Sequence, residues 1–563
     1  MEGHLGGKMS SFSQREPRLR AMSCLHCRRR KIKCDSNRPA CSSCVRDGKS
    51  NECLYDDSDA SETFELYRML EQLEKRWRDL NASRSAAAQE SPQATQECIH
   101  DAIRIPENGG TGVLPTTGNE TGALSDEPPI ALSKYLVDAF MPHAEQCGLS
   151  VPTDNFKARI NGSPPDPNLH PALKNSVWLW GCHFARDPRT EPHKATFLRR
   201  SLENLHDLLF QTDKVLQAIQ TECLLSSYFL AHGRRLEGIH HINSAALLTV
   251  IAGFHQLVVP SITGHSHHGS NEILAFNEKL HAFWNTFVLE RCWNALNGFP
   301  SQQWSSQDPR TVILSPWPSD SVTPHLLPPV ITPQPSRAQH TRRSATTGAI
   351  GGQAAPIAPV ENFLASNNGS RAYAMAELRA KCGALMEHAV SIEGGRDHRA
   401  PMPDVYQRQF SKCQSIITGF CGSLPPLPQG GNRESSFAMG TVFTTHAMAH
   451  AAMMRLHCCL AQQVISSHGK CLDEAREIAG ALRLLNKEDF NFLEATIGAC
   501  WAMAAAVFIR DLEITANVPR APNRANVTVA LDLTTSAMVT LGKIFPVVAQ
   551  QAQTITAMRT RIL

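Results

Sequence analysis

Apolar residues in this chain recur every three or four positions, the spacing of one helix face, and no segment shows the alternation typical of a strand. The pattern starts near Pro129, runs to about Asp320, and resumes from Glu361 to the C-terminus. Two predicted core faces are Trp284, Phe287, Val288, Arg291 and Ala295, and Ala449, Ala452, Met453, Leu456 and Leu460. We therefore predict a mostly α protein with a large all-α body.

Changes in composition divide the chain into segments. Two stretches are rich in Ser, Ala, Thr, Gly and Pro and are predicted to be linkers, and no internal repeat is evident. The predicted order is a disordered basic arm (1–20), a cysteine-rich module (21–55), a short coiled coil (59–81), a linker (82–128), a helical domain (129–320), a second linker (321–360) and a C-terminal helical region (361–563).

An apolar series follows the cysteine-rich module. Its five residues are spaced 4-3-4-3, like the a and d positions of a coiled coil, and are Leu66, Leu70, Leu73, Trp77 and Leu80. The hypothesis that this seam favours is dimerisation, so we expect a homodimer. The alternative is an amphipathic helix that packs on its own body.

The positive charge of the chain is concentrated near its N-terminus. The whole chain has a net charge of +3, but residues 15–53 carry eleven Lys and Arg against four Asp and Glu, and the rest is slightly acidic. This distribution favours a polyanion as the partner of the N-terminal segment alone.

No segment predicts a membrane span or a secretory signal. The N-terminal stretch lacks an apolar core region, and the apolar run 497–509 is shorter than the roughly 18 residues that a spanning helix needs. We therefore expect a soluble intracellular protein with no membrane partner.

Six of the 18 cysteines lie in one short segment, with the spacing C-x2-C-x6-C-x6-C-x2-C-x8-C. In an intracellular protein such clustering favours thiolate–metal chemistry over disulfides, and paired C-x2-C units suit tetrahedral zinc. Two tetrahedral ions need eight bonds, so six sulfurs suffice only if two of them bridge. The spacing therefore predicts a binuclear cluster of two Zn²⁺ ions. Its ligands are Cys24, Cys27, Cys34, Cys41, Cys44 and Cys53.

A basic run lies between the second and third of these cysteines, from Arg28 to Lys33. By itself such a run fits a solvated surface or a localisation signal as well as it fits nucleic-acid binding. On a helix held by a metal cluster it favours double-stranded DNA, because Arg and Lys donate hydrogen bonds to guanine in the major groove and to phosphates.

The segment SCLHCRRRKIKCDSNRPACSSCVRDGKSNEC resembles the DNA-binding module of the fungal zinc binuclear cluster transcription factors. The resemblance implies that Cys24 and Cys41 bridge the two zinc ions and that each other cysteine binds one. It also implies a nuclear regulator of RNA polymerase II genes that reads CGG-like triplets and works with the transcription machinery or co-regulators.

The same resemblance implies roles for the basic run. Lys31, together with Arg30, would contact bases, whereas Arg28 and Lys33 would contact phosphates. The rival hypothesis is a zinc-based protein-interaction module of the ubiquitin-ligase type. Such modules usually use eight ligands in two unshared sites, whereas this segment offers six cysteines and His26.

Residues 129–320 are similar to the helical regulatory domain, the middle homology region, of these regulators. The similarity rests on three stretches, 170–181, 233–238 and 282–300. Glu290 stands where many relatives have Asp, which is a mild departure. We expect this region to respond to a signal or to recruit co-regulators.

Features that suggest catalysis do not form a complete site. His446 and His450 have H-x3-H spacing, but an alanine occupies the place where a zinc protease needs its general-base Glu. Cys458 and Cys459 lie in an apolar helix and are interpreted as two buried thiols. With no P-loop and no dinucleotide-binding motif, we predict that the protein is not an enzyme.

Overall fold

The computed structural model describes the cysteine-rich module and most of the helical body. The described residues are 24–35, 37, 40–50, 53, 127–162, 166–260, 267–297, 303–304, 308–319, 358–365, 374–394, 404–428, 437–461, 464–516 and 523–561. They belong to two compact units, Met1–Gln96 and Glu97–Leu563. The described residues form helices and no strand, which confirms the prediction of a mostly α protein. The predicted coiled coil lies outside the described residues.

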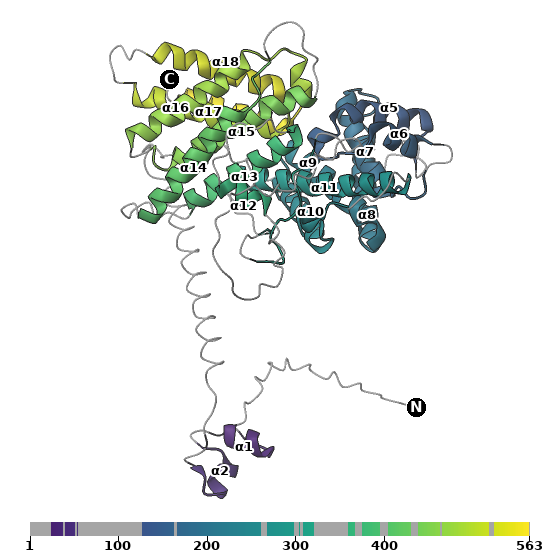
Figure 1. The fold of residues 1–563 in the computed structure, drawn as a ribbon, viewed down its shortest axis with the longest axis vertical. Helices are drawn as coiled ribbons and strands as arrows, with labels where there is room; N and C mark the ends of the chain where they lie inside the picture. Colours follow the sequence, from purple (N-terminus) through teal and green to yellow (C-terminus); the bar gives the residue numbers. More distant parts are fainter. Residues whose placement is uncertain are drawn as a thin grey trace, which may run out of the picture. The chain divides into compact units, whose positions relative to one another are not determined.

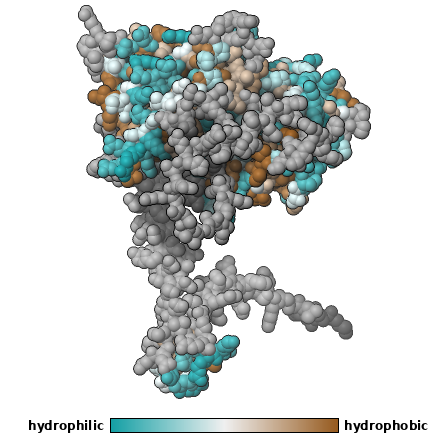
Figure 2. All heavy atoms as spheres, in the orientation of Figure 1, coloured by the Kyte–Doolittle hydropathy of each residue, from teal (hydrophilic) through white to brown (hydrophobic). Residues whose placement is uncertain are grey.

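The N-terminal unit contains two short helices, α1 (Leu25–Arg30) and α2 (Ser42–Arg46). Its fully buried side chains, among those described, are all cysteines, and only Cys34 and Ala40 pack partly buried against them. The branched side chains of Ile32 and Val45 are 40% and 57% exposed. The coloured atoms of this unit are mainly hydrophilic in Figure 2. The unit therefore has sulfur where other small domains have an apolar core.

The body is built from two sets of helices that follow one another along the chain (Figure 1). The first set is α5 (Ile130–Phe140), α6 (Thr153–Asn161), α7 (Pro171–Ala185), α8 (His193–Leu209), α9 (Val215–Ala231), α10 (Arg235–Ile251) and α11 (His267–Asn297), with 3-10 turns at η2 (Met141–His143), η3 (Glu145–Cys147), η4 (Thr212–Lys214) and η5 (Phe254–Gln256). The second set is α12 (Pro359–Ala365), α13 (Met375–Gly394), α14 (Asp404–Ser423), α15 (Phe437–Cys458), α16 (Ile465–Leu482), α17 (Thr496–Ile514), α18 (Arg524–Gly542) and α19 (Pro546–Thr560), with the 3-10 turn η7 (Asp489–Phe492).

The start and packing of α7 follow from its sequence. His170 Nδ1 accepts a hydrogen bond from the Ala172 N–H at 3.2 Å, and Pro171 occupies the first helical position, where no N–H is needed. Gly181 allows close approach to α5, because a Cβ atom there would lie 2.4 Å from the carbonyl oxygen of Leu136. Helix α7 packs between α5 and α8.

Helices α11 and α13 join the two sets into one core. They pack against each other, and a single hydrophobic cluster continues from Leu136 in α5 to Ile555 in α19. The predicted face of α11 that includes Trp284 and Phe287 is buried, as expected. The predicted face of α15 is buried too, but so is almost every other residue of that helix, because α13, α14, α16 and α17 surround it.

Helix α17 contains the apolar run identified in the sequence. Its residues are buried against α15, α16, α18 and α19, which explains the run as a core helix. Among the described residues, no helix has the length and apolar character needed to cross a membrane.

Buried ion pairs connect α13 to its neighbours. Near its start, Arg379 pairs with Glu494 at 2.8 Å, and near its end Glu393 pairs with Arg455 of α15 at 2.8 Å. All four side chains are at most 7% exposed. Losing one partner would leave an uncompensated buried charge, so these pairs fix how α13 sits in the core.

Candidate metal centre and nucleic-acid interface

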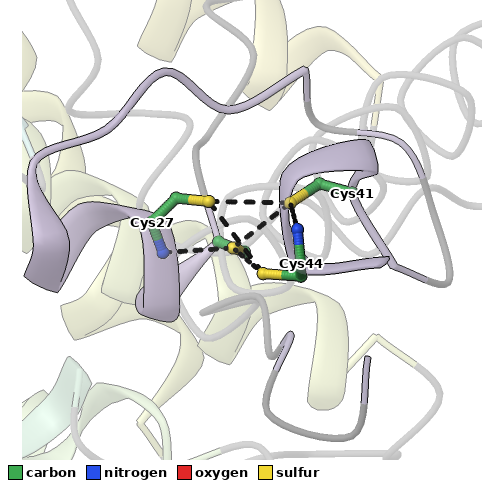
Figure 3. Close-up of side chains that lie close together, drawn as sticks. Cys27, Cys41 and Cys44 are labelled. Atoms are coloured by element: carbon green, nitrogen blue, oxygen red, sulfur yellow. Dashed lines mark hydrogen bonds between the residues drawn. The ribbon is translucent and has the colours of Figure 1, made fainter. Parts of the chain in front are cut away.

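Four cysteine sulfurs meet where α1 faces α2. Figure 3 shows Cys27 on one side and Cys41 with Cys44 on the other, their sulfurs turned toward one another. Cys24 lies next to α1 and belongs to the same group. The Sγ–Sγ distances are 3.8 Å for Cys24–Cys41, 3.7 Å for Cys24–Cys44, 3.6 Å for Cys27–Cys41 and 4.0 Å for Cys27–Cys44.

These distances are those expected around zinc. A Zn–S bond of about 2.3 Å gives a tetrahedron with sulfur–sulfur edges of about 3.8 Å. The two remaining cysteines join the group: Cys34 Sγ lies within 4.8 Å of Cys41 Sγ, and the Cys53 thiol interacts with those of Cys24, Cys41 and Cys44. The six predicted ligands therefore do come together, and their soft, close-packed donors fit zinc.

The two halves of the module repeat each other, a feature that the sequence analysis missed. Cys24 and Cys41 are 17 positions apart, as are Cys27 and Cys44. The Cys27 N–H donates to Cys24 Sγ at 3.4 Å, and the Cys44 N–H donates to Cys41 Sγ at 3.5 Å. The match continues beyond the helices, where the Cys24 N–H donates to Cys34 Sγ at 3.5 Å and the Cys41 N–H to Cys53 Sγ at 3.2 Å.

Burial and backbone donors act in opposite directions on these thiols. Burial raises the pKa of Cys27 to about 12 and also raises the pKa of Cys24 and of Cys44. The Cys44 N–H lowers the pKa of Cys41, and the Cys41 N–H lowers the pKa of Cys53. The buried thiols with raised pKa are protonated at neutral pH until a metal ion replaces the proton, so zinc uptake releases protons and acid opposes it.

Both helices end in the same way. The Ile32 N–H donates to the Cys27 carbonyl at 3.1 Å and the Lys49 N–H to the Cys44 carbonyl at 2.8 Å, which is the Schellman arrangement. This motif needs a left-handed residue just before the donor. That residue is Gly48 in the second half, with φ of 65°, but Lys31 in the first half, with φ of 54°.

The basic run ends on the exposed surface at the end of α1. Lys31 and Lys33 are exposed, and the Lys33 carbonyl accepts a hydrogen bond from Ser43 Oγ at 3.2 Å. Arg30 pairs with Asp47, with its Nη1 atom 3.1 Å from Oδ2, and both side chains are more than a third exposed. Arg28 belongs to α1, but its side chain is not among those that the structure describes.

Two acidic residues support this surface and were not predicted. Asp35 accepts hydrogen bonds from the Ser42 N–H at 3.1 Å and from its hydroxyl group, so it provides a partner for the first N–H of α2. The Ser42 hydrogen bond lowers the pKa of Asp35. Asp47 pairs with Arg30 from 17 positions away, and no local sequence pattern indicates this pairing.

Residues 22–61 match the family model of the fungal Zn(2)-Cys(6) binuclear cluster domain. This matched segment has the ligand set of a zinc cluster module. Modules of this type bind two zinc ions and occur in DNA-binding transcription factors, so the prediction of a two-zinc cofactor is confirmed. The match covers a small part of the chain. Searches with the whole chain find no curated protein and no solved structure that is detectably similar. The similarity of residues 129–320 to a regulatory domain stays a prediction.

The other candidates from the sequence have local partners in the body. His446 Nε2 lies 2.8 Å from the Pro425 carbonyl oxygen, and His450 Nδ1 lies 2.6 Å from a carboxylate oxygen of Glu474. Both histidines line a cavity of about 380 Å³ next to Trp501. Each ring thus has a hydrogen-bond partner within the protein.

Removal of zinc should unfold the module and spare the body. We expect a strong chelator to abolish hydrogen-exchange protection of amides in residues 24–53 of the full chain, because the fully buried side chains among its described residues are cysteines. Protection of α17, a core helix of the body, is the internal control, and added zinc should restore the module. Zinc retention should weaken as the pH falls. Persistent amide protection in the module after complete chelation would contradict the metal-dependent fold.

Proposed function

We propose that this protein is a sequence-specific transcription factor that reads CGG-like triplets in the major groove at RNA polymerase II genes. The observation that carries the proposal is the zinc cluster module with exposed Lys31 and Lys33 at the end of α1. The rival ubiquitin-ligase type of module is not favoured, because the matched domain is one of DNA-binding regulators. The same class of function implies that the protein acts in the nucleus and is not an enzyme.

Cys24 and Cys41 are the bridging ligands in this proposal. The two halves of the module are related by an approximate two-fold repeat, in which Cys24 and Cys41 occupy equivalent positions. Two bridging ligands in a symmetric two-ion cluster must be equivalent in this way, and this pair meets that requirement. The Cys53 thiol interacts with Cys24, Cys41 and Cys44, which makes one set of four ligands. Cys41 also interacts with Cys27 and Cys34, as the other set requires. The two sets then share Cys24 and Cys41.

Substitution of a bridging cysteine should therefore be more damaging than substitution of a terminal one. Cys24→Ser or Cys41→Ser removes a bond from each of the two ions, so both should be lost, whereas Cys34→Ser or Cys53→Ser should retain about one ion per module. Elemental analysis of the full-length variants measures this, with wild type as the two-ion control. Equal zinc loss in all four variants would contradict the assignment of the bridges.

Lys31 is the proposed base-contacting residue, with Arg30 beside it. The repeat shows that glycine fits the equivalent position, where Gly48 has the same left-handed backbone. A side chain in this conformation costs roughly 1–2 kcal/mol. Lys31 therefore carries a conformational free-energy cost that a glycine at the same position would not have. A residue kept at such a cost supports a function for its side chain. Asp47 holds Arg30 against the same surface.

Arg28 and Lys33 are the proposed phosphate contacts. Lys33 is exposed, and its backbone is anchored to α2 through Ser43 Oγ, so its position is fixed relative to the cluster. A contact to phosphate adds affinity for any DNA sequence and strengthens the dependence of binding on salt.

Two lysine variants separate these roles. Lys31→Gly should fold at least as well as wild type but should lose about 1–3 kcal/mol of discrimination between cognate and scrambled DNA. Lys33→Ala should weaken binding to both DNAs alike and reduce the salt slope by about one. Titrations of the full chain at several salt concentrations, with module stability followed in parallel, measure both effects. Equal losses on cognate and scrambled DNA for Lys31→Gly would refute the base contact.

The segment 59–81 is the proposed dimerisation helix. A short tether between the module and the seam would limit the separation of two modules, so DNA with two half-sites should be bound at a preferred spacing. Residues 129–320 are the proposed regulatory domain, which would respond to a signal or recruit co-regulators.

Breaking the seam should remove the preference for paired sites. The double variant Leu70→Ala and Leu73→Ala should bind paired half-sites no more tightly than a single half-site, and it should sediment as a monomer. Gln72→Ala, outside the seam, is the matched control. Insertion of several residues near Ser58 should change the preferred spacing in the wild-type background. A wild-type chain that binds single and paired sites with equal affinity and one-to-one stoichiometry would exclude the dimer.

A further inference from the structure

The helical body contains a second group of metal-ligating side chains, where α13 and α15 end. Cys458 is the last residue of α15, Cys459 follows it, and Glu393 is the penultimate residue of α13. Both sulfurs lie close to one carboxylate oxygen: Glu393 Oε1 is 3.0 Å from Cys458 Sγ and 3.1 Å from Cys459 Sγ. Arg455 forms an ion pair with the other oxygen, with its Nη2 atom 2.8 Å from Oε2. The sequence analysis interpreted these cysteines as two buried thiols and did not identify the glutamate.

We propose that Cys458, Cys459 and Glu393 bind one thiophilic divalent cation of the Zn²⁺ class. The two sulfurs are 3.9 Å apart, close to the edge of about 3.8 Å expected for zinc. A sulfur–oxygen edge around zinc is about 3.6 Å, from bonds of about 2.3 and 2.1 Å. The Glu393 carboxylate oxygen therefore has to move away from the two sulfurs by about half an ångström to admit the ion.

Charge balance favours a divalent ion. Without metal, each thiol donates its proton toward Glu393, and the charge of that carboxylate is offset by Arg455. When the ion binds, two S–H bonds break, two S–metal bonds form and two protons leave to solvent, with no change in oxidation state. The group is neutral before and after this exchange. Neutrality matters because Cys458, Glu393 and Arg455 are all buried, where an uncompensated charge is costly.

The geometry of the group leaves the ion accessible. Cys458 is 6% exposed, whereas Cys459 is only half-buried, so an ion can approach from the Cys459 side. Three protein ligands leave the fourth tetrahedral position for water or another small ligand, unlike a closed structural site. Within the described residues of the body, no other three metal-ligating side chains lie this close together.

Zinc counting on the full-length protein tests the site. We expect wild type, after equilibration with Zn²⁺ and removal of free metal, to hold about three ions: two in the N-terminal module and one in the body. The double variant Cys458→Ser and Cys459→Ser should hold about two. Serine hydroxyls can still donate to Glu393, so the fold of the body should be preserved.

Cys471→Ser is the matched control, because Cys471 is a buried thiol on the adjacent helix α16 whose Sγ donates to the Met454 carbonyl. This variant should keep the third ion. Calorimetry in buffers of different ionisation enthalpy should show that binding of the third ion releases about two protons. Zn²⁺ should also raise the melting temperature of the body in wild type and in Cys471→Ser, but not in the double variant. A wild-type chain with two ions would overturn the proposal, and so would a third ion that persists in the double variant.

Discussion

The N-terminal unit depends on bonds between thiolate sulfur and zinc, because the described part of this segment buries little else. Its fully buried side chains are cysteines, and Ile32 and Val45 are exposed to solvent. Burial raises the pKa of Cys24, Cys27 and Cys44, so without a metal the sulfurs would be packed as neutral thiols with weak mutual interactions. Two zinc ions convert the same side chains into a cross-linked centre. The positions of both helices, and of every basic residue on them, then follow from the metal.

The repeat within the module explains how a nearly symmetric cluster presents an asymmetric surface. The N–H to sulfur contacts within the two C-x2-C turns and the Schellman ends of α1 and α2 correspond at an offset of 17 residues. The side chains at corresponding positions differ in charge: Lys31 corresponds to Gly48, and Arg30 corresponds to Asp47. Positive charge therefore gathers at the end of α1, while Asp47 from the second half holds Arg30 beside it. The backbone supports the cluster equally in both halves, and the side chains make one half cationic.

Buried ion pairs hold helices in place in the body, as the metal ions do in the module. Helix α13 is tied to Glu494 through Arg379 and to α15 through Glu393 and Arg455, and all four side chains are buried. Such pairs add little net stability over apolar side chains of the same volume, but they penalise any packing that separates them. The pair at the end of α13 also leaves one oxygen of Glu393 facing two thiols. A contact that fixes helix position thus brings a carboxylate to a pair of cysteines.

The chemistry of the module and the helical character of the body could be predicted from the amino-acid sequence. Ligand number follows from counting cysteines, and helices follow from local apolar spacing, so neither needs knowledge of distant contacts. The faces predicted around Trp284 and Ala449 are buried, although the periodicity could not show that α15 is enclosed on all sides. The left-handed backbone of Lys31, the Arg30–Asp47 pair and the contact of Cys458 with Glu393, 65 positions away, became known only from the folded structure. These features depend on the meeting of separate segments, and local propensity carries no information about which segments meet.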